Sequence, residues 1–89
     1  MRTIIRRQRF SDDMKRMKRL GKNVEELLAA VDLLAEFGEL PSGYGPHMLT
    51  GEWSGVWECH IESDWLLIYQ ITAQEVVLLR TRTHSDLFD

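Results

Sequence analysis

The sequence predicts an α+β domain in which a first strand precedes an antiparallel helical hairpin and a mostly antiparallel sheet. Three observations lead to this fold class. Apolar residues recur at helical spacing between positions 10 and 37, β-branched and aromatic residues dominate positions 56–82, and only short turns separate these later segments. With 89 residues the chain can form one core of modest size, so we expect a single domain over residues 1–89.

The N-terminal part is predicted to form a short strand and a basic helix. Thr3-Ile4-Ile5 is β-branched and brief, which is typical of a strand. Ser11 is a suitable N-cap, and Asp12 and Asp13 would then complement the helix dipole in the first turn. Gly21 would end the helix. Its apolar side would consist of Phe10, Met14, Met17 and Leu20.

A second helix is predicted between Asn23 and Gly38. Asn23 can cap its start, and Glu26 three positions on completes a capping-box pattern. A wide apolar stripe should face the core, and the short linker between the helices predicts a hairpin packed across a sheet. The stripe contains Val24, Leu27, Leu28, Val31, Leu34 and Phe37.

The second half of the chain is predicted to form an antiparallel meander. A loop rich in proline and glycine, residues 38–46, leads into strands at about Val56–Ile61, Trp65–Ile71 and Val76–Arg82. Glu58 and His60 should share one face of the first of these strands, with Cys59 on the other. In the last strand, simple alternation puts Val76, Leu78, Arg80 and Arg82 on one face.

Charge is divided sharply along the chain. Residues 1–22 carry nine Lys or Arg against two Asp, whereas residues 23–89 carry two Arg against twelve Asp or Glu. The basic segment could bind a polyanionic or acidic partner, or it could be solvated surface that balances the acidic remainder. On the polar side of the first helix, the candidate residues for binding such a partner are Lys15, Arg16, Lys18 and Arg19.

The remaining composition favours a cytoplasmic protein. The chain has one cysteine, Cys59, which cannot form an internal disulfide, and no signal peptide is recognisable. Its apolar stretches are far shorter than the ~20 residues that a membrane-spanning helix needs. We therefore expect no membrane association.

Three histidines, all in the second half, are the candidate catalytic groups. Paired strands could bring His47, His60 and His84 to one edge beside Asp64, an arrangement suited to proton transfer. Each could instead be a hydrogen-bonded structural residue. Zinc is another reading of His and Asp, but no close pair has ligand spacing, so no metal and no cofactor is expected.

Two further residue types could bind a polyanionic substrate near these histidines. Arg80 and Arg82 are the best candidates for phosphate ligands. Trp65, like Trp53 and Trp57, could stack on a base, although aromatic residues in strands more often pack in the core.

Three blocks of sequence together resemble YafQ-type toxins of the RelE superfamily, which belong to bacterial toxin–antitoxin systems. They are Gly51-Glu52-Trp53-Ser54-Gly55, the run from His60 to Tyr69, and the run from Arg80 to Phe88. The resemblance implies a ribosome-dependent endoribonuclease that cleaves mRNA, with a cognate antitoxin protein, the 70S ribosome and mRNA as partners. Arg82 stands where relatives often carry glycine, and its charge could serve the phosphate.

The resemblance also implies roles for residues of this chain. His47, His60 and His84 match the family's catalytic histidines and Asp64 its acidic residue, while Arg80 and Phe88 match its substrate-binding arginine and terminal aromatic. The implied reaction needs no metal: a base deprotonates the ribose 2′-OH, which attacks the adjacent phosphate, and an acid protonates the leaving 5′-oxygen. Two other function classes stay open: a non-catalytic regulator binding an acidic protein or nucleic acid, and a metal-dependent hydrolase.

Overall fold

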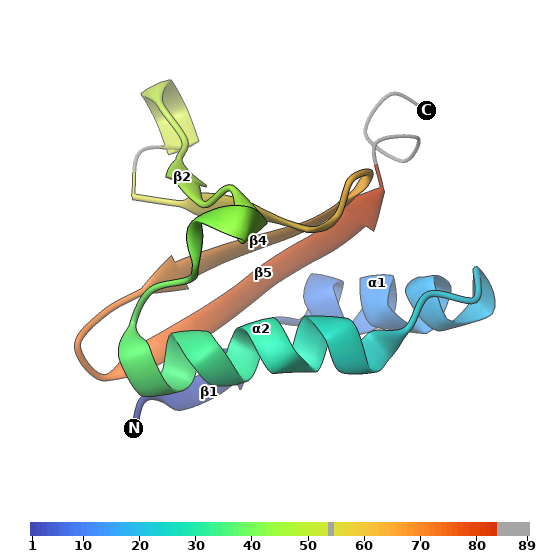
Figure 1. Ribbon diagram of the computed structural model, residues 1–89, viewed down its shortest axis with the longest axis horizontal. Helices are drawn as coiled ribbons and strands as arrows, with labels where there is room; N and C mark the ends of the chain where they lie inside the picture. The colour runs from blue at the N-terminus through green and yellow to red at the C-terminus, as the bar shows by residue number, and fades with distance from the viewer. Residues whose placement is uncertain (54, 84–89) are drawn as a thin grey trace.

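The computed structural model describes residues 1–53 and 55–83, and these form the predicted α+β fold (Figure 1). Two helices lie against one side of a five-stranded sheet, and two single-turn 3-10 helices, η1 and η2, flank the shortest strand. In chain order the elements are β1 (Thr3–Arg6), α1 (Gln8–Arg19), α2 (Val24–Phe37), η1 (Ser42–Tyr44), β2 (His47–Met48), η2 (Gly51–Trp53), β3 (Trp57–Glu62), β4 (Trp65–Ile71) and β5 (Glu75–Thr83).

The sheet has the order β1-β5-β4-β3-β2, and all pairs except one are antiparallel. The exception is β1, which pairs in parallel with β5 because the whole helical hairpin separates the two strands in sequence. The β4–β5 turn is closed by the Thr72 hydroxyl, which accepts hydrogen bonds from the amides of Gln74 and Glu75. The predicted meander is therefore confirmed, and β4 has the predicted bounds, Trp65–Ile71.

Helix α1 begins three residues before the predicted cap. Its first residue is Gln8, Arg7 occupies the N-cap position without a side-chain hydrogen bond, and Ser11 lies inside the helix. The reason is that Phe10, which is 1% exposed, belongs to the helical stripe that fills the core, so the helix must begin before it. The predicted cap was wrong, and Asp13 consequently lies in the buried middle of the helix, away from its first turn.

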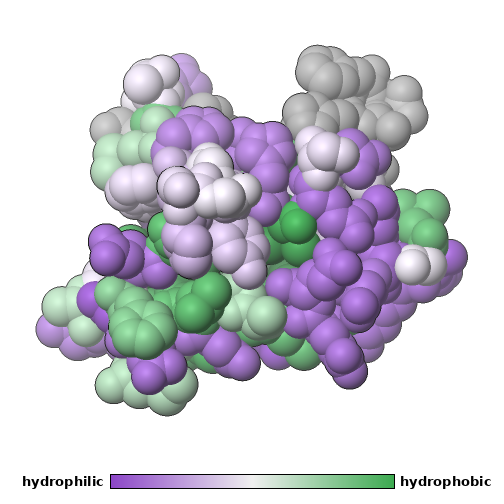
Figure 2. All heavy atoms as spheres, in the orientation of Figure 1, coloured by the Kyte–Doolittle hydropathy of each residue, from purple (hydrophilic) through white to green (hydrophobic). Residues whose placement is uncertain are grey.

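Helix α2 begins and ends as predicted. The Asn23 side chain accepts a hydrogen bond from the Glu25 amide at 3.1 Å, and Gly38 ends the helix in a left-handed conformation with φ of 76°. One member of the predicted stripe differs: Phe37 is 63% exposed. Phe37 is the last residue of α2 and lies at the edge of the stripe. Figure 2 shows an apolar patch over this end of α2.

The core lies between the helices and one face of the sheet. Its sheet side comes from every second residue of β3, β4 and β5, and Leu40 joins it from the loop after α2. The buried cluster consists of Phe10, Met14, Met17, Leu27, Ala30, Val31, Leu34, Ala35, Leu40, Cys59, Trp65, Leu67, Tyr69, Val76 and Leu78. Cys59 faces the core, opposite to His60, as alternation predicted.

A register shift in β5 changes which face its arginines occupy. Leu78 pairs with Tyr69, but Arg80 pairs with Ile68, so one extra residue, Leu79, is inserted into β5. Before this bulge Val76 and Leu78 face the core, whereas after it Thr81 and Thr83 are the buried residues. The predicted face shared by Val76, Leu78, Arg80 and Arg82 is therefore wrong: the two arginines lie on the opposite face of the sheet.

Candidate active site

The face of the sheet that lies opposite the helices carries four of the predicted site residues, His47, His60, Arg80 and Arg82. Cross-strand partners share a face, and the register lines them up in two neighbouring rows. One row runs from His47 through Glu58 and Ile68 to Arg80, and the next runs from His60 through Leu66 to Arg82. Neighbouring strands lie ~4.8 Å apart, so each row places an imidazole and a guanidinium on one surface two or three strands apart.

His47 is held at the β2 end of this surface by two contacts. Its Nδ1 lies 3.1 Å from the Gly45 carbonyl oxygen, and its Nε2 lies 3.4 Å from Oε1 of Glu58. The carbonyl oxygen accepts a hydrogen bond, so the Nδ1 side carries the proton in that contact. Its side chain is 51% exposed, whereas that of Glu58 is 20% exposed. The imidazole is thus oriented by the backbone on one side and by a carboxylate on the other.

Glu58 is a site residue that sequence reasoning missed. The strand pattern already placed Glu58 and His60 on one face, but it could not show that β2 would set His47 directly opposite Glu58. The two-residue length of β2 explains this, because so short a strand has no recognisable alternation. A carboxylate beside an imidazole can fix the orientation of the ring.

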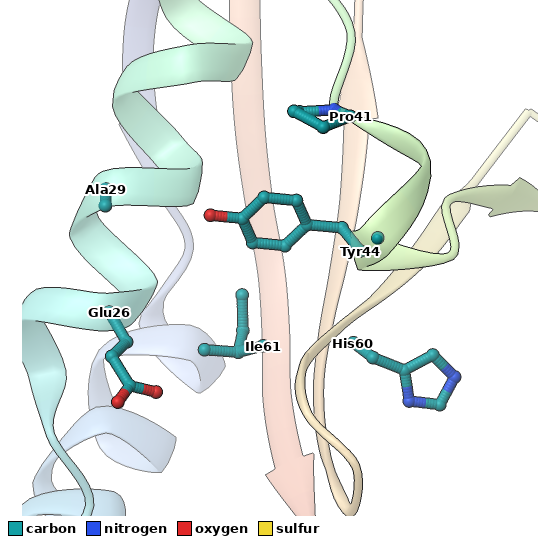
Figure 3. Close-up of a pocket in the computed structure, with 7 residues that line it drawn as sticks. Glu26, Ala29, Pro41, Tyr44, His60 and Ile61 are labelled. Carbon is teal, nitrogen blue, oxygen red and sulfur yellow. The ribbon is translucent and has the colours of Figure 1, made fainter.

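His60 lies at the rim of a cavity of 440 Å³ between α2, η1 and β3 (Figure 3). In Figure 3 its ring points away from α2, while the Tyr44 hydroxyl points toward α2. The backbone of Gly45 passes close to the His60 ring: a Cβ atom at Gly45 would lie 3.4 Å from Cδ2. The cavity is lined by Glu26, Ala29, Pro41, Gly43, Tyr44, His60 and Ile61.

Arg80 is bound to a carboxylate of α1. Its Nε donates to Asp13 Oδ2 at 2.7 Å and its Nη2 to Asp13 Oδ1 at 3.1 Å. These bonds raise the pKa of Arg80 above its ordinary value, so the guanidinium stays charged. The side chain of Asp13 is only 5% exposed, and that of Arg80 is 25% exposed.

Asp64 contacts a lysine of the helical layer. It lies in the β3–β4 turn, and its carboxylate is 3.6 Å from the Lys22 ammonium, which also donates to Glu62 at 3.1 Å. Lys22 belongs to the linker between the helices, so this cluster ties the turn to the helical layer. That Asp64 acts beside the histidines stays a prediction.

Trp65, a predicted substrate-binding residue, belongs to the core. It is 0% exposed, and its indole N–H donates to Thr81 Oγ1 at 2.7 Å. A side chain enclosed in this way presents no face to a base, so its assignment as a substrate-binding residue was wrong. Burial likewise raises the pKa of the Cys59 thiol to about 12, which removes it as a nucleophile at neutral pH.

The basic residues of α1 are placed as predicted, with one difference. Lys15, Lys18 and Arg19 are exposed on the helix, opposite the buried Met14 and Met17. Arg16 is only half exposed, and its Nη2 lies 3.7 Å from Asp13 Oδ1. Three of the four predicted residues are therefore exposed, with Arg16 at their border.

Two of the predicted site residues, His84 and Phe88, lie outside the described residues. Within residues 1–53 and 55–83, no three His, Cys, Asp or Glu side chains are grouped so that they could hold a metal ion. Over the same ranges, neither helix is long and apolar enough to cross a membrane.

Comparison with known proteins agrees with this fold. A family model described as the bacterial toxin of type II toxin–antitoxin systems, YafQ, matches residues 2–89. The mRNA interferase toxin YafQ of Escherichia coli K12 is 36% identical over 80 residues, covering 89% of this chain and 87% of that protein. The crystal structure of the E. coli DinJ–YafQ toxin–antitoxin complex superposes with a TM-score of 0.88 at 35% identity, covering 99% of this chain and 98% of that one.

A third relative extends the comparison to another genus. A metal-bound toxin from Helicobacter pylori superposes with a TM-score of 0.87 at 36% identity, covering 99% of this chain and all of that one. Fold and matches together define the protein as a toxin of the bacterial type II toxin–antitoxin class. Within that class, the chain belongs to the YafQ family, which confirms the resemblance found in the sequence.

Proposed function

We propose that this toxin is a ribosome-dependent endoribonuclease that cleaves mRNA by attack of a ribose 2′-OH on the adjacent phosphate. The observation that carries the proposal is the surface on which Glu58, His60 and Arg82 accompany His47, with His47 Nε2 only 3.4 Å from Glu58. The curated E. coli relative is an mRNA interferase, and this chain shares its family. Two imidazoles can supply a base and an acid near neutral pH without a metal.

The chain's own residues suit the separate parts of that reaction. An imidazole removes the 2′-OH proton, and a second imidazole, in its protonated form, delivers a proton to the leaving 5′-oxygen. Glu58 holds His47 in place, and Arg80 and Arg82 offset the charge that builds on the phosphate. His84 is proposed as a further acid/base group and Phe88 as a base-stacking residue, from their match to the family.

The partners follow from the same reasoning. We propose that the toxin acts on mRNA bound to the 70S ribosome and is restrained by a cognate antitoxin, since a relative is known in complex with the antitoxin DinJ. A cytosolic enzyme that cuts translating messages would otherwise stop the growth of its host.

The test is cleavage of a defined mRNA on purified ribosomes by the unsubstituted toxin and by His47→Ala, Glu58→Gln, His60→Ala and His84→Ala. Loss of one acid/base group should slow cleavage by ~10²–10⁴-fold while circular dichroism stays unchanged. His47→Gln is a matched variant that keeps a polar group without titrating. The mechanism would be contradicted if folded His60→Ala and His84→Ala cleaved mRNA as fast as the unsubstituted toxin. Loss of activity on addition of EDTA would favour a metal-dependent hydrolase.

A further inference from the structure

We infer that Asp13 is a positioning residue that fixes Arg80 for contact with the reacting phosphate, an inference that rests on the function proposed above. Asp13 lies buried on α1, in the helical layer, whereas His47 and His60 lie on the opposite face of the sheet. It acts through Arg80, which stands at the end of the row that begins with His47 and Glu58.

Asp13 and Arg80 form a bidentate ion pair. Two of the five guanidinium N–H donors, on Nε and Nη2, point to the two oxygens of one carboxylate, at 2.7 and 3.1 Å. Such a pair fixes the plane and the direction of the guanidinium, which a single bond would leave free to rotate. The donors on Nη1 then face a defined direction.

Asp13 is itself held by the backbone of β5. The Thr81 amide donates to Asp13 Oδ2 at 3.1 Å. This amide is available because β1 pairs with β5 only from Glu75 to Leu78, so the edge of β5 beyond the Leu79 bulge has no strand beside it. Asp13 therefore satisfies a backbone donor and a guanidinium together, and with 5% exposure its side chain has little freedom to move.

This arrangement explains why a charged residue is buried in the middle of α1. Burying a carboxylate costs several kcal/mol unless it is paired and hydrogen-bonded, and a role confined to packing would be served by an apolar residue. The surroundings keep the remaining donors of Arg80 near an electropositive site: a cavity of 380 Å³ is lined by Arg7, Gln8, Arg9, Leu79 and Arg80.

The test combines a double-mutant cycle with a stereochemical readout. Single-turnover cleavage of ribosome-bound mRNA is measured for the unsubstituted toxin, Asp13→Asn, Arg80→Ala and the double variant. Each mRNA carries one sulfur at the scissile phosphate, as either diastereomer. A donor aimed at one non-bridging oxygen makes one diastereomer react more slowly than the other, and a purely structural role for Asp13 would not change that preference.

We expect Asp13→Asn to lower the cleavage rate by about 10- to 100-fold, as misplacement of a positioned group does. It should also abolish the diastereomer preference, as Arg80→Ala does, and the double variant should be no slower than Arg80→Ala. Asp12→Asn is the matched control, because Asp12 is the exposed neighbour that accepts a hydrogen bond from Gln8, and this variant should keep rate and preference.

Three results would overturn the inference. The first is an unchanged diastereomer preference in Asp13→Asn, and the second is a rate loss in the double variant equal to the product of the two single rate losses. The third is equal cleavage of both diastereomers by the unsubstituted toxin. If Asp13→Asn does not fold, Asp13→Glu decides, since it keeps the charge but displaces the guanidinium by about one methylene. It should weaken the preference, and a full preference would overturn the inference. Absence of any cleavage by the unsubstituted toxin would instead refute the proposed function itself.

Discussion

At the residue scale, two buried hydrogen bonds of Thr81 join β5 to β4. Trp65 donates its indole N–H to the Thr81 hydroxyl, and that hydroxyl donates in turn to the Leu66 carbonyl at 2.9 Å. Both side chains are 0% exposed, so neither group has water as an alternative partner. The chain of bonds is therefore complete only when both residues are present.

Replacing Trp65 by phenylalanine should lower the free energy of unfolding by about 1–3 kcal/mol, because one buried hydrogen bond is lost and a gap is left. Urea denaturation measures the change. Thr81→Val removes the other partner, and the two losses should be less than additive because they break one network. A change below ~0.5 kcal/mol in both single variants would show that the network contributes little.

The same residues show where single-residue prediction works and where it stops. Cys59 and His60 were placed on opposite faces by alternation alone, and this was correct. Trp65 could be read as a stacking platform or as core, because its burial depends on Thr81, sixteen positions away. Asp13 was misread because a suitable cap at Ser11 outweighed the helical position of Phe10, and no local signal announces an ion pair with Arg80.

At the element scale, the β3–β4 turn packs against the start of α2 through charged groups. The pKa of Glu26 is raised above its ordinary value, first by a hydrogen bond with the Glu62 carboxylate and then by desolvation, while Lys22 opposes the shift. A raised carboxyl pKa means that the folded state favours the protonated form. The stabilisation is fully present below the ordinary pKa of 4.5 and is lost as the pH rises through the folded-state pKa.

Glu26→Gln should therefore raise the melting temperature at neutral pH and leave it nearly unchanged in acid, because the amide keeps a hydrogen-bond donor without a charge. Thermal unfolding monitored by circular dichroism from acid to neutral pH would measure the change in melting temperature. Glu25→Gln is the matched control, since Glu25 is the exposed neighbour of Glu26 in the same helical turn. Parallel pH profiles for Glu26→Gln and the unsubstituted protein would contradict this account.

Strand prediction succeeded for the bounds of β4 and for the faces of β3, and it failed for the faces of β5. The meander and the bounds of β4 followed from local composition, but the Leu79 bulge reverses the alternation of β5 and moved both arginines to the other face. The bulge lets β5 bury Leu78 before it and Thr81 after it, so it depends on pairing with β4 that the sequence of β5 alone does not contain.

The exposed basic residues of α1 carry a prediction of their own. Replacing Lys15, Lys18 and Arg19 by glutamine should weaken ribosome binding and flatten its dependence on salt, because each phosphate contact releases counterions. Arg16 is left in place because it borders Asp13. Neutralising the exposed Asp32 and Glu36 of α2 by Asp32→Asn and Glu36→Gln controls for net charge. Unchanged affinity at physiological salt would mean that this surface is only solvated.

At the scale of the whole molecule, charge and chemistry occupy different parts of the fold. The basic residues gather in residues 1–22, on β1, α1 and the linker, whereas His47 and His60 lie on the opposite face of the sheet in an acidic part of the chain. A partner with acidic segments would be attracted to the helical layer first. The total charge of −3 conceals this division.

This separation leads to a prediction about control of the toxin. An antitoxin that lies along α1 would cover the basic surface needed for ribosome entry without altering the site itself. Hydrogen exchange with and without the cognate antitoxin should therefore show protection of α1 and of the linker at Gly21–Asn23. The triple glutamine variant of α1 should bind the antitoxin more slowly at low salt, with a smaller change in the dissociation rate, because steering by exposed charge acts mainly on association. Protection confined to residues 47–83, with α1 unaffected, would instead mean that the antitoxin blocks the catalytic surface directly.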